Sequence, residues 1–202
     1  MSRMSSLESL FVNSYLAYLL HKTAGFGRLL ELAGRECPRR LLEVGCGAGI
    51  TTSILARKYP TSEIVALDID EAQIARAKKR LVSQRVRFVL GDAGQLQFPT
   101  ESFDACFASY VFHHMPCFPI ALREIHRVLQ PGASLYVLEL SIRRGIPRVL
   151  IEEERPGEVT SPEDTITGFF TRSKLLREIE RSGFKVGDCK GILQVYLRCE
   201  RA

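Results

Sequence analysis

The sequence predicts an α/β domain built on a mostly parallel sheet with helices on both faces. Short apolar segments of strand length alternate with amphipathic segments of helix length along most of the chain. The apolar segment 41–44 runs directly into a turn that contains three glycines, and the segment 64–67 closes on the acidic residue Asp68. The chain has 202 residues, 46% hydrophobic and 25% charged, which is the length and balance of one folded domain.

The first half of the chain predicts two strand–helix units and a third strand. The strand 41–44 leads through the glycine turn into a helix that stops at Pro60, since proline cannot continue a helix. The strand 64–67 is followed by Asp70, which predicts the N-cap of a second helix. The third strand, 86–90, then runs into a Gly-Asp pair.

The second half continues the alternation. The remaining predicted strands cover residues 103–108, 135–140, 186–189 and 192–199. An amphipathic helix with Ile120 and Leu129 on its inner face ends at Gln130-Pro131-Gly132. The last predicted helix covers 173–182, and a long connection occupies 141–168. Long connections in compact domains are usually functional or mobile.

The turn Glu43-Val44-Gly45-Cys46-Gly47-Ala48-Gly49 is the strongest functional signal. Glycines lack a Cβ atom, so backbone at such a turn can approach a ligand closely. The spacing is not that of a dinucleotide-binding turn, because Ile50 stands where the third glycine is needed, and no Gly-Lys-Ser/Thr follows as in a phosphate loop. A carboxylate at Glu43 would repel a pyrophosphate. The turn therefore predicts a nucleoside ligand with positive charge, and S-adenosylmethionine (SAM) fits.

Composition narrows the setting of the protein. No apolar run is long enough to cross a bilayer, and the N-terminus lacks the pattern of a signal peptide. The six cysteines are scattered without zinc-type spacing, which predicts no metal site and a reducing, cytoplasmic compartment. The net charge of +5 comes from short clusters without a basic stripe or interleaved aromatic residues. This pattern argues against a nucleic-acid surface.

Four segments occur in a specific order along the chain: 42–49, 66–70, 91–93 with its continuation to the Phe112-His113-His114-Met115 stretch, and 122–133. Together they resemble the class I SAM-dependent methyltransferases, in particular the small-molecule branch of the ubiquinone/menaquinone C-methyltransferases (type 11). The resemblance implies a three-layer Rossmann-like fold with a seven-stranded sheet in the order 3-2-1-4-5-7-6, one strand being antiparallel. It also implies in-line methyl transfer from SAM to a small-molecule acceptor, with S-adenosylhomocysteine as product.

The resemblance implies roles for residues on the adenosine side of SAM. Asp68 would accept hydrogen bonds from both ribose hydroxyls, and charge-assisted bonds of this kind are strong. Ile69 would lie against the adenine face. Asp92 would accept from the adenine amine, and the N–H of Ala93 would donate to a ring nitrogen.

Other residues are expected on the methionine side. Glu43 would face the ammonium group, and Ser109 would contact the methionyl portion. The turn residues that would admit the ligand are Gly45, Cys46, Gly47 and Gly49. Residues 1–35 are expected to form a helical cover or lid on the SAM-binding domain 36–202, within one structural domain, and Tyr15 in this cover is a further candidate contact.

The residues after the fourth strand are candidates for proton transfer. His113 and His114 follow that strand, and an imidazole titrates near neutrality. Tyr110 is a third candidate, and a packed histidine without catalytic function is the alternative. A base is needed only if the acceptor loses a proton. Ser109-Tyr110-Val111-Phe112 replaces the Asn/Asp-Pro-Pro-Tyr/Phe motif, which argues against methylation of a nucleobase amine.

Two alternative functions remain open from the sequence. A pI near 9.0 is compatible with an RNA methyltransferase. The lack of a certain catalytic base is compatible with a protein that binds SAM without turnover. The motifs leave the acceptor, the methylated atom and the oligomeric state open.

Overall fold

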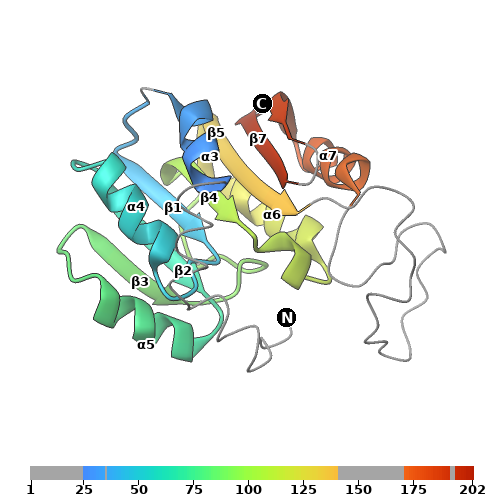
Figure 1. Ribbon diagram of the computed structural model, residues 1–202. Helices are drawn as coiled ribbons and strands as arrows, with labels where there is room; N and C mark the ends of the chain where they lie inside the picture. The colour runs from blue at the N-terminus through green and yellow to red at the C-terminus, as the bar shows by residue number, and fades with distance from the viewer. Residues whose placement is uncertain (1–24, 35, 141–170, 192–193) are drawn as a thin grey trace.

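The computed structural model describes residues 25–34, 36–140, 171–191 and 194–202. Figure 1 shows a central sheet with helices packed on its two faces. The elements in chain order are α3 (Phe26–Ala33), β1 (Arg40–Val44), α4 (Ile50–Lys58), β2 (Glu63–Asp68), α5 (Glu71–Arg80), β3 (Val86–Leu90), β4 (Phe103–Ser109), the 3-10 helix η2 (Phe112–His114), α6 (Phe118–Val128), β5 (Leu129–Leu140), α7 (Arg172–Arg181), β6 (Phe184–Lys190) and β7 (Gln194–Arg201).

The sheet has seven strands in the order β3-β2-β1-β4-β5-β7-β6, which confirms the predicted fold class. Strands β1 to β5 are parallel to their neighbours within this group. Strand β7 runs antiparallel to both β5 and β6, and is the one antiparallel strand. Because parallel strands share a direction, the carboxyl ends of β1, β2, β4 and β5 meet at one edge of the sheet, where α/β folds bind ligands.

Two main apolar clusters hold the layers together. Successive side chains of a strand point to opposite faces, so Leu41 packs with α3 and α4 while Leu42 packs with α6 and α7. On the α3 face, the rings of Phe107 and Tyr136 stack with their centroids 4.6 Å apart. On the α6 face, the apolar stripe of the helix includes Leu122. Both faces of the central strands are therefore buried, as a parallel sheet requires.

The N-cap prediction is confirmed. The side chain of Asp70 accepts hydrogen bonds from the N–H groups of Ala72 and Gln73 at 2.8 and 3.4 Å. The bond to Ala72 has the better geometry, and together they satisfy N–H groups that have no partner inside the helix. The basic cluster at the end of the same helix, residues 78–80, is exposed, as expected of a solvated helix face.

Two predictions for α6 are wrong. Ile120 in the first turn is 43% exposed, because the buried stripe of the helix runs through Ala121 and Ile125 instead. The helix ends at Val128, and β5 already begins at Leu129, so the Gln-Pro-Gly segment lies within the strand. A register shift against β4 between Phe103 and Ala105 accommodates this irregular start.

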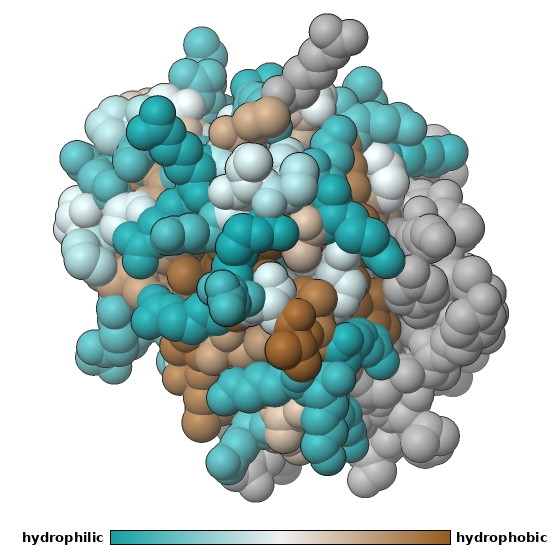
Figure 2. All heavy atoms as spheres, turned by 90° about the vertical axis from the view of Figure 1, so that its left-hand side faces the viewer, coloured by the Kyte–Doolittle hydropathy of each residue, from teal (hydrophilic) through white to brown (hydrophobic). Residues whose placement is uncertain are grey.

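Figure 2 shows the face on the β3 and α5 side of the molecule, where hydrophilic side chains surround smaller apolar areas. The exposed large apolar residues near this edge are Val82, which follows α5, and Leu90 at the end of β3.

Among the helices of the described residues, none has the length and apolarity that a membrane span needs. Helix α3 is the described part of the predicted cover; residues 1–24 and the connection 141–168 lie outside the described residues.

Candidate functional site

The glycine turn joins β1 to α4 and is tied to the end of β2 by hydrogen bonds. The N–H groups of Gly45 and Cys46 both donate to the carbonyl oxygen of Leu67, at 2.8 and 3.0 Å. The N–H of Gly47 donates to Oδ2 of Asp68 at 2.8 Å. Three backbone N–H groups therefore fix the turn against the end of the neighbouring strand.

Two of the glycines are required for different reasons. A Cβ atom on Gly45 would lie 2.2 Å from Cγ2 of Val111, so close packing after β4 excludes a side chain there. A Cβ atom on Gly47 would meet no atom of the described residues within 4 Å, although its φ of +50° also favours glycine. As far as the described residues show, the space beside Gly47 is open, and the turn therefore fits a ligand that approaches the backbone closely.

Asp68 ends β2 beside this turn and is partly buried. Its Oδ1 accepts a hydrogen bond from the N–H of Asp70 at 2.9 Å, while Oδ2 accepts from Gly47. Burial raises the pKa of Asp68, and these backbone hydrogen bonds act in the opposite direction. Two carboxylate oxygens can accept about four hydrogen bonds, so Asp68 keeps capacity for the hydroxyls of a ligand. The next residue, Ile69, is partly exposed beside it.

Glu43 points to the first turn of α4. Its side chain is 1% exposed and accepts hydrogen bonds from the hydroxyl of Thr51 and, at 2.6 Å, from that of Thr52. Burial raises the pKa of Glu43 to about 7; the threonine hydrogen bonds lower it and the charge of Asp68 raises it. Because both carboxylates lie at this edge and repel each other, a cationic ligand group beside them would be stabilised.

The loop after β3 brings the adenine-side candidates to the same edge. The N–H of Gly91 donates to the carbonyl oxygen of Asp68 at 2.9 Å. Asp92 is exposed, and its Oδ1 accepts from the N–H of Gly94 at 2.8 Å, which closes a small turn around the buried Ala93. The structure therefore places Asp92 and Ala93 next to the Asp68 end of β2.

A second polar cluster lies at the ends of β4 and β5. Nδ1 of His113 lies 2.7 Å from Oε2 of Glu139. The other oxygen of this buried carboxylate accepts from the N–H groups of Val111 and Phe112, both at 2.7 Å. The rings of His113 and His114 lie with centroids 4.0 Å apart. Glu139 thus fixes both the backbone that carries the histidines and the ring of the first one.

Glu139 was missed by sequence reasoning. Its signal is a single carboxylate within the otherwise apolar strand segment Tyr136-Val137-Leu138-Glu139-Leu140. A buried charged residue of this kind is rare unless it is paired. Glu139 lies near the carboxyl end of β5, as Asp68 lies at the carboxyl end of β2. The same argument that makes Asp68 a candidate site residue therefore applies to Glu139.

The side chain of Tyr110 belongs to the apolar cluster on the α3 side of the sheet. Its φ is +51°, and its N–H donates to the carbonyl oxygen of Leu138 at 2.7 Å. Burial raises the pKa of the Tyr110 hydroxyl. The preceding Ser109 is buried, and its Oγ has no hydrogen-bond partner among the described residues. Buried hydroxyl groups usually form a hydrogen bond, so a bound ligand could supply the partner of the Ser109 hydroxyl.

The remaining expectations concern Cys46, a metal site and Tyr15. Cys46 is buried against Ala66 and Ile74, and burial holds the pKa of its thiol well above the usual range. It acts as a small apolar residue under the turn. Within the described ranges, no group of three His, Cys, Asp or Glu side chains could hold a metal ion. Tyr15 lies outside the described residues.

The chain is similar to known methyltransferases. The family model described as "Methyltransferase domain" matches residues 42–137. A demethylmenaquinone methyltransferase of Thermus thermophilus is 33% identical over 130 residues, which are 60% of this chain and 59% of that protein. A fatty-acid O-methyltransferase of Mycolicibacterium smegmatis is 35% identical over 140 residues, or 69% and 48% of the two chains. The chain therefore spans about half the length of the curated relatives it matches.

Solved structures share the fold. A SAM-dependent methyltransferase from Aquifex aeolicus superposes with a TM-score of 0.76 over 99% of this chain and 100% of that one, at 17% identity, which shows the fold alone. The [4+2]-cyclase SpnF superposes with a TM-score of 0.64 at 29% identity, covering 81% of this chain and 59% of that one.

Proposed function

We propose that the chain, whose residues 42–137 match the family model of a methyltransferase domain, is a class I SAM-dependent methyltransferase of type 11 and transfers a methyl group from SAM to a small-molecule acceptor. The observation that carries the proposal is the space beside Gly47 that the described residues leave open, next to Asp68 at the carboxyl edge of the sheet. The relatives named above are methyltransferases, and neither is an RNA enzyme.

SAM, when bound, supplies a methyl group on a sulfonium that is already a good leaving group. The protein therefore has to bind and align the reactants, and alignment alone can contribute on the order of 7–11 kcal/mol. Asp68 offers carboxylate oxygens to the ribose hydroxyls, and Asp92 with the N–H of Ala93 offers an acceptor and a donor to adenine. Glu43 supplies negative charge toward the ammonium group.

His113 is proposed as the base for acceptors that lose a proton. The hydrogen bond from Nδ1 to Glu139 holds the proton on Nδ1, so that Nε2 is the basic nitrogen of the ring. His114 packs on the ring of His113 and supports its orientation. Tyr110 contributes through its backbone, because its left-handed conformation turns the chain so that the next two N–H groups reach Glu139.

The acceptor class follows from the relatives. A fatty acid and demethylmenaquinone, the substrates in their names, are both lipids, and a lipid with an acidic oxygen or an activated ring carbon is the first acceptor to test. We expect no nucleic-acid substrate, because the basic residues lie in short clusters without interleaved aromatic residues. The scattered cysteines support a cytoplasmic location.

The proposal is tested in two steps. Calorimetry should first show SAM binding by the folded chain, and formation of S-adenosylhomocysteine should then be followed with free fatty acids, quinols and an unstructured RNA as acceptors. Turnover with a lipid and not with RNA is the expected result. A folded chain that fails to bind SAM at high micromolar concentration contradicts the proposal. Binding with no turnover on any acceptor would instead favour a SAM-binding protein or a different reaction, as in the cyclase.

A further inference from the structure

The loop between β3 and β4 carries the proposed adenine contacts and is anchored at both ends. On one side, the N–H of Gly91 bonds to the carbonyl oxygen of Asp68. On the other side, Leu96 is buried in the core, and the ring of Phe98 packs edge-on against Phe103 with centroids 5.2 Å apart. Residues 92–95 lie between these anchors, so their position depends on where the second anchor holds the chain.

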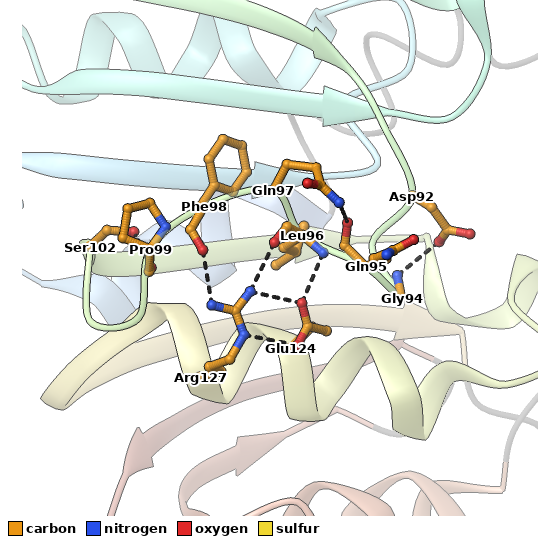
Figure 3. A network of polar contacts seen from close by, with 10 residues as sticks. All are labelled: Asp92, Gly94, Gln95, Leu96, Gln97, Phe98, Pro99, Ser102, Glu124 and Arg127. Atoms are coloured by element: carbon orange, nitrogen blue, oxygen red, sulfur yellow. Dashed lines mark hydrogen bonds and ion pairs between the residues drawn. The ribbon is translucent and has the colours of Figure 1, made fainter.

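Arg127 on α6 binds two carbonyl groups of this loop. Its Nη2 donates to the carbonyl oxygen of Leu96 at 2.8 Å, and its Nη1 donates to that of Phe98 at 2.9 Å. Figure 3 shows the guanidinium group pointing from the helix toward both carbonyls, with Glu124 beside it. The planar guanidinium group holds the two carbonyl oxygens with separate nitrogens in a fixed geometry, which the single ammonium nitrogen of a lysine cannot reproduce.

Glu124 completes the contact from the same helix face. Its Oε2 accepts from the N–H of Leu96 at 2.9 Å, and its two oxygens accept from Nε and Nη2 of Arg127 at 2.9 and 2.8 Å. The two side chains are 23% and 34% exposed, so water screens the pair only in part. Three backbone groups of the loop, all within Leu96 and Phe98, are therefore bonded to one charged pair.

We infer that Glu124 and Arg127 are positioning residues for the adenine part of the cofactor site. The inference rests on the proposed binding of SAM through Asp92 and Ala93, which the pair does not touch. The pair fixes the residue directly after the turn formed by Asp92, Gly94 and Gln95. Without the Glu124–Arg127 pair, Asp92 and Ala93 would be in the position that binds adenine for only a fraction of the time. The apparent affinity for SAM would then be the intrinsic affinity multiplied by that fraction.

The chain offers a matched control on α7. Glu178 and Arg181 have the same spacing of three residues, and Nη1 of Arg181 lies 2.7 Å from Oε1 of Glu178. Arg181 is 71% exposed, and this pair lies on the helix surface. A lysine at position 181 should therefore change no loop and no ligand affinity.

The test compares the variant Arg127→Lys with Arg181→Lys. Calorimetry would measure the affinities for S-adenosylhomocysteine and for its inosine counterpart, in which an oxygen replaces the adenine amine. The wild type should prefer the adenine compound. Arg127→Lys should weaken binding of that compound roughly tenfold, as expected if the loop is correctly placed a tenth of the time, and should reduce the preference. Arg181→Lys should leave both affinities unchanged.

Equal losses for both nucleosides, or no loss in Arg127→Lys, would overturn the inference, since a general loss of stability acts on both compounds alike. A wild type that binds both compounds equally would overturn it as well. If Arg127→Lys fails to fold, Glu124→Gln takes its place: its amide oxygen keeps an acceptor for the N–H of Leu96, but its NH2 group replaces the oxygen that accepts from Nε of Arg127, so the same loss of preference for the adenine compound is expected. Failure of the wild type to bind either compound would instead refute the proposed function.

Discussion

Replacing Glu43 with glutamine tests the electrostatics under the glycine turn. Glu43 is buried, with its pKa raised from 4.5 to about 7. Between these two values the carboxyl group is ionised in the unfolded chain and protonated in the folded one, so stability falls as the pH rises through this window. The difference of about 2.5 pKa units corresponds to about 3 kcal/mol of unfolding free energy, at 1.36 kcal/mol per unit.

Glu43→Gln should remove this component of the pH dependence. Glutamine has nearly the same shape, and its amide can accept from one threonine hydroxyl and donate to the other. The assay is urea unfolding of both proteins, without SAM, from pH 4.5 to pH 8. The variant should gain stability relative to the wild type as the pH rises, by about 3 kcal/mol in total. Glu63→Gln, on the exposed start of β2, is the matched control and should change stability by less than about 0.5 kcal/mol. A difference between Glu43→Gln and the wild type that does not vary with pH would refute the assignment.

The same variant has a functional consequence. If the ionised carboxylate of Glu43 faces the ammonium group of SAM, binding below pH 7 must release a proton. The wild-type affinity should therefore rise between pH 6 and pH 8, and calorimetry in buffers of different ionisation enthalpy should detect proton release. Glu43→Gln should bind SAM more weakly than the wild type at pH 8, and it should show neither the rise of affinity with pH nor the release of a proton. An identical pH dependence of SAM affinity in the two proteins would show that Glu43 binds only the threonine hydroxyls of α4 and does not interact with the ammonium group of SAM.

Three further substitutions separate cofactor binding from turnover. Asp68→Ala should weaken SAM binding by about 1.5–3 kcal/mol per lost charged hydrogen bond. It should also lower the melting temperature, because the N–H of Gly47 loses its acceptor. An unchanged affinity for SAM would contradict the proposed contact between Asp68 and the ribose. Gly47→Ala should lower the free energy of unfolding by about 1–2 kcal/mol, because the residue has a positive φ. It should also abolish the rise in melting temperature that SAM causes. A full rise in the variant would contradict close approach of the ligand to the backbone. Glu139→Gln should leave SAM affinity intact and lower kcat while shifting the pH–rate profile, and an unchanged profile would exclude His113 as the base.

The proposed cofactor half of the site could be predicted from the sequence because its determinants are local. A strand, a glycine turn and an acidic strand end are contiguous segments, so the pattern predicts that Gly47 and Asp68 meet at one edge, and a hydrogen bond joins them. The direction of the Glu43 side chain is not local, since it depends on how closely α4 packs on β1. Sequence reasoning placed its charge at the right strand end and did not anticipate its bonds to the two threonines of the helix.

The contact between His113 and Glu139, the proposed proton-transfer half of the site, could not be predicted from the sequence. His113 and Glu139 are 26 residues apart and belong to different elements, and only the pairing of β4 with β5 brings them within 2.7 Å. The prediction that Ile120 is buried is wrong for a related reason. The elements that a helix packs against decide which of its faces is buried, and the buried face of α6 carries Ala121 and Ile125 and not Ile120.

Helix α6 connects the two halves of the site. It begins at Phe118, four residues after His114, and its last two turns carry Glu124 and Arg127. Its amino end therefore follows the residues proposed to handle the proton, while its carboxyl end holds the loop proposed to bind adenine. The helix is fixed on the sheet through buried residues such as Leu122, so it can serve as a rigid spacer between these two groups. On this reasoning, Arg127→Lys should impair cofactor binding and leave kcat at saturating SAM unchanged, the reverse of Glu139→Gln. A fall of kcat in both variants would mean that α6 transmits the loss of the loop to the histidines.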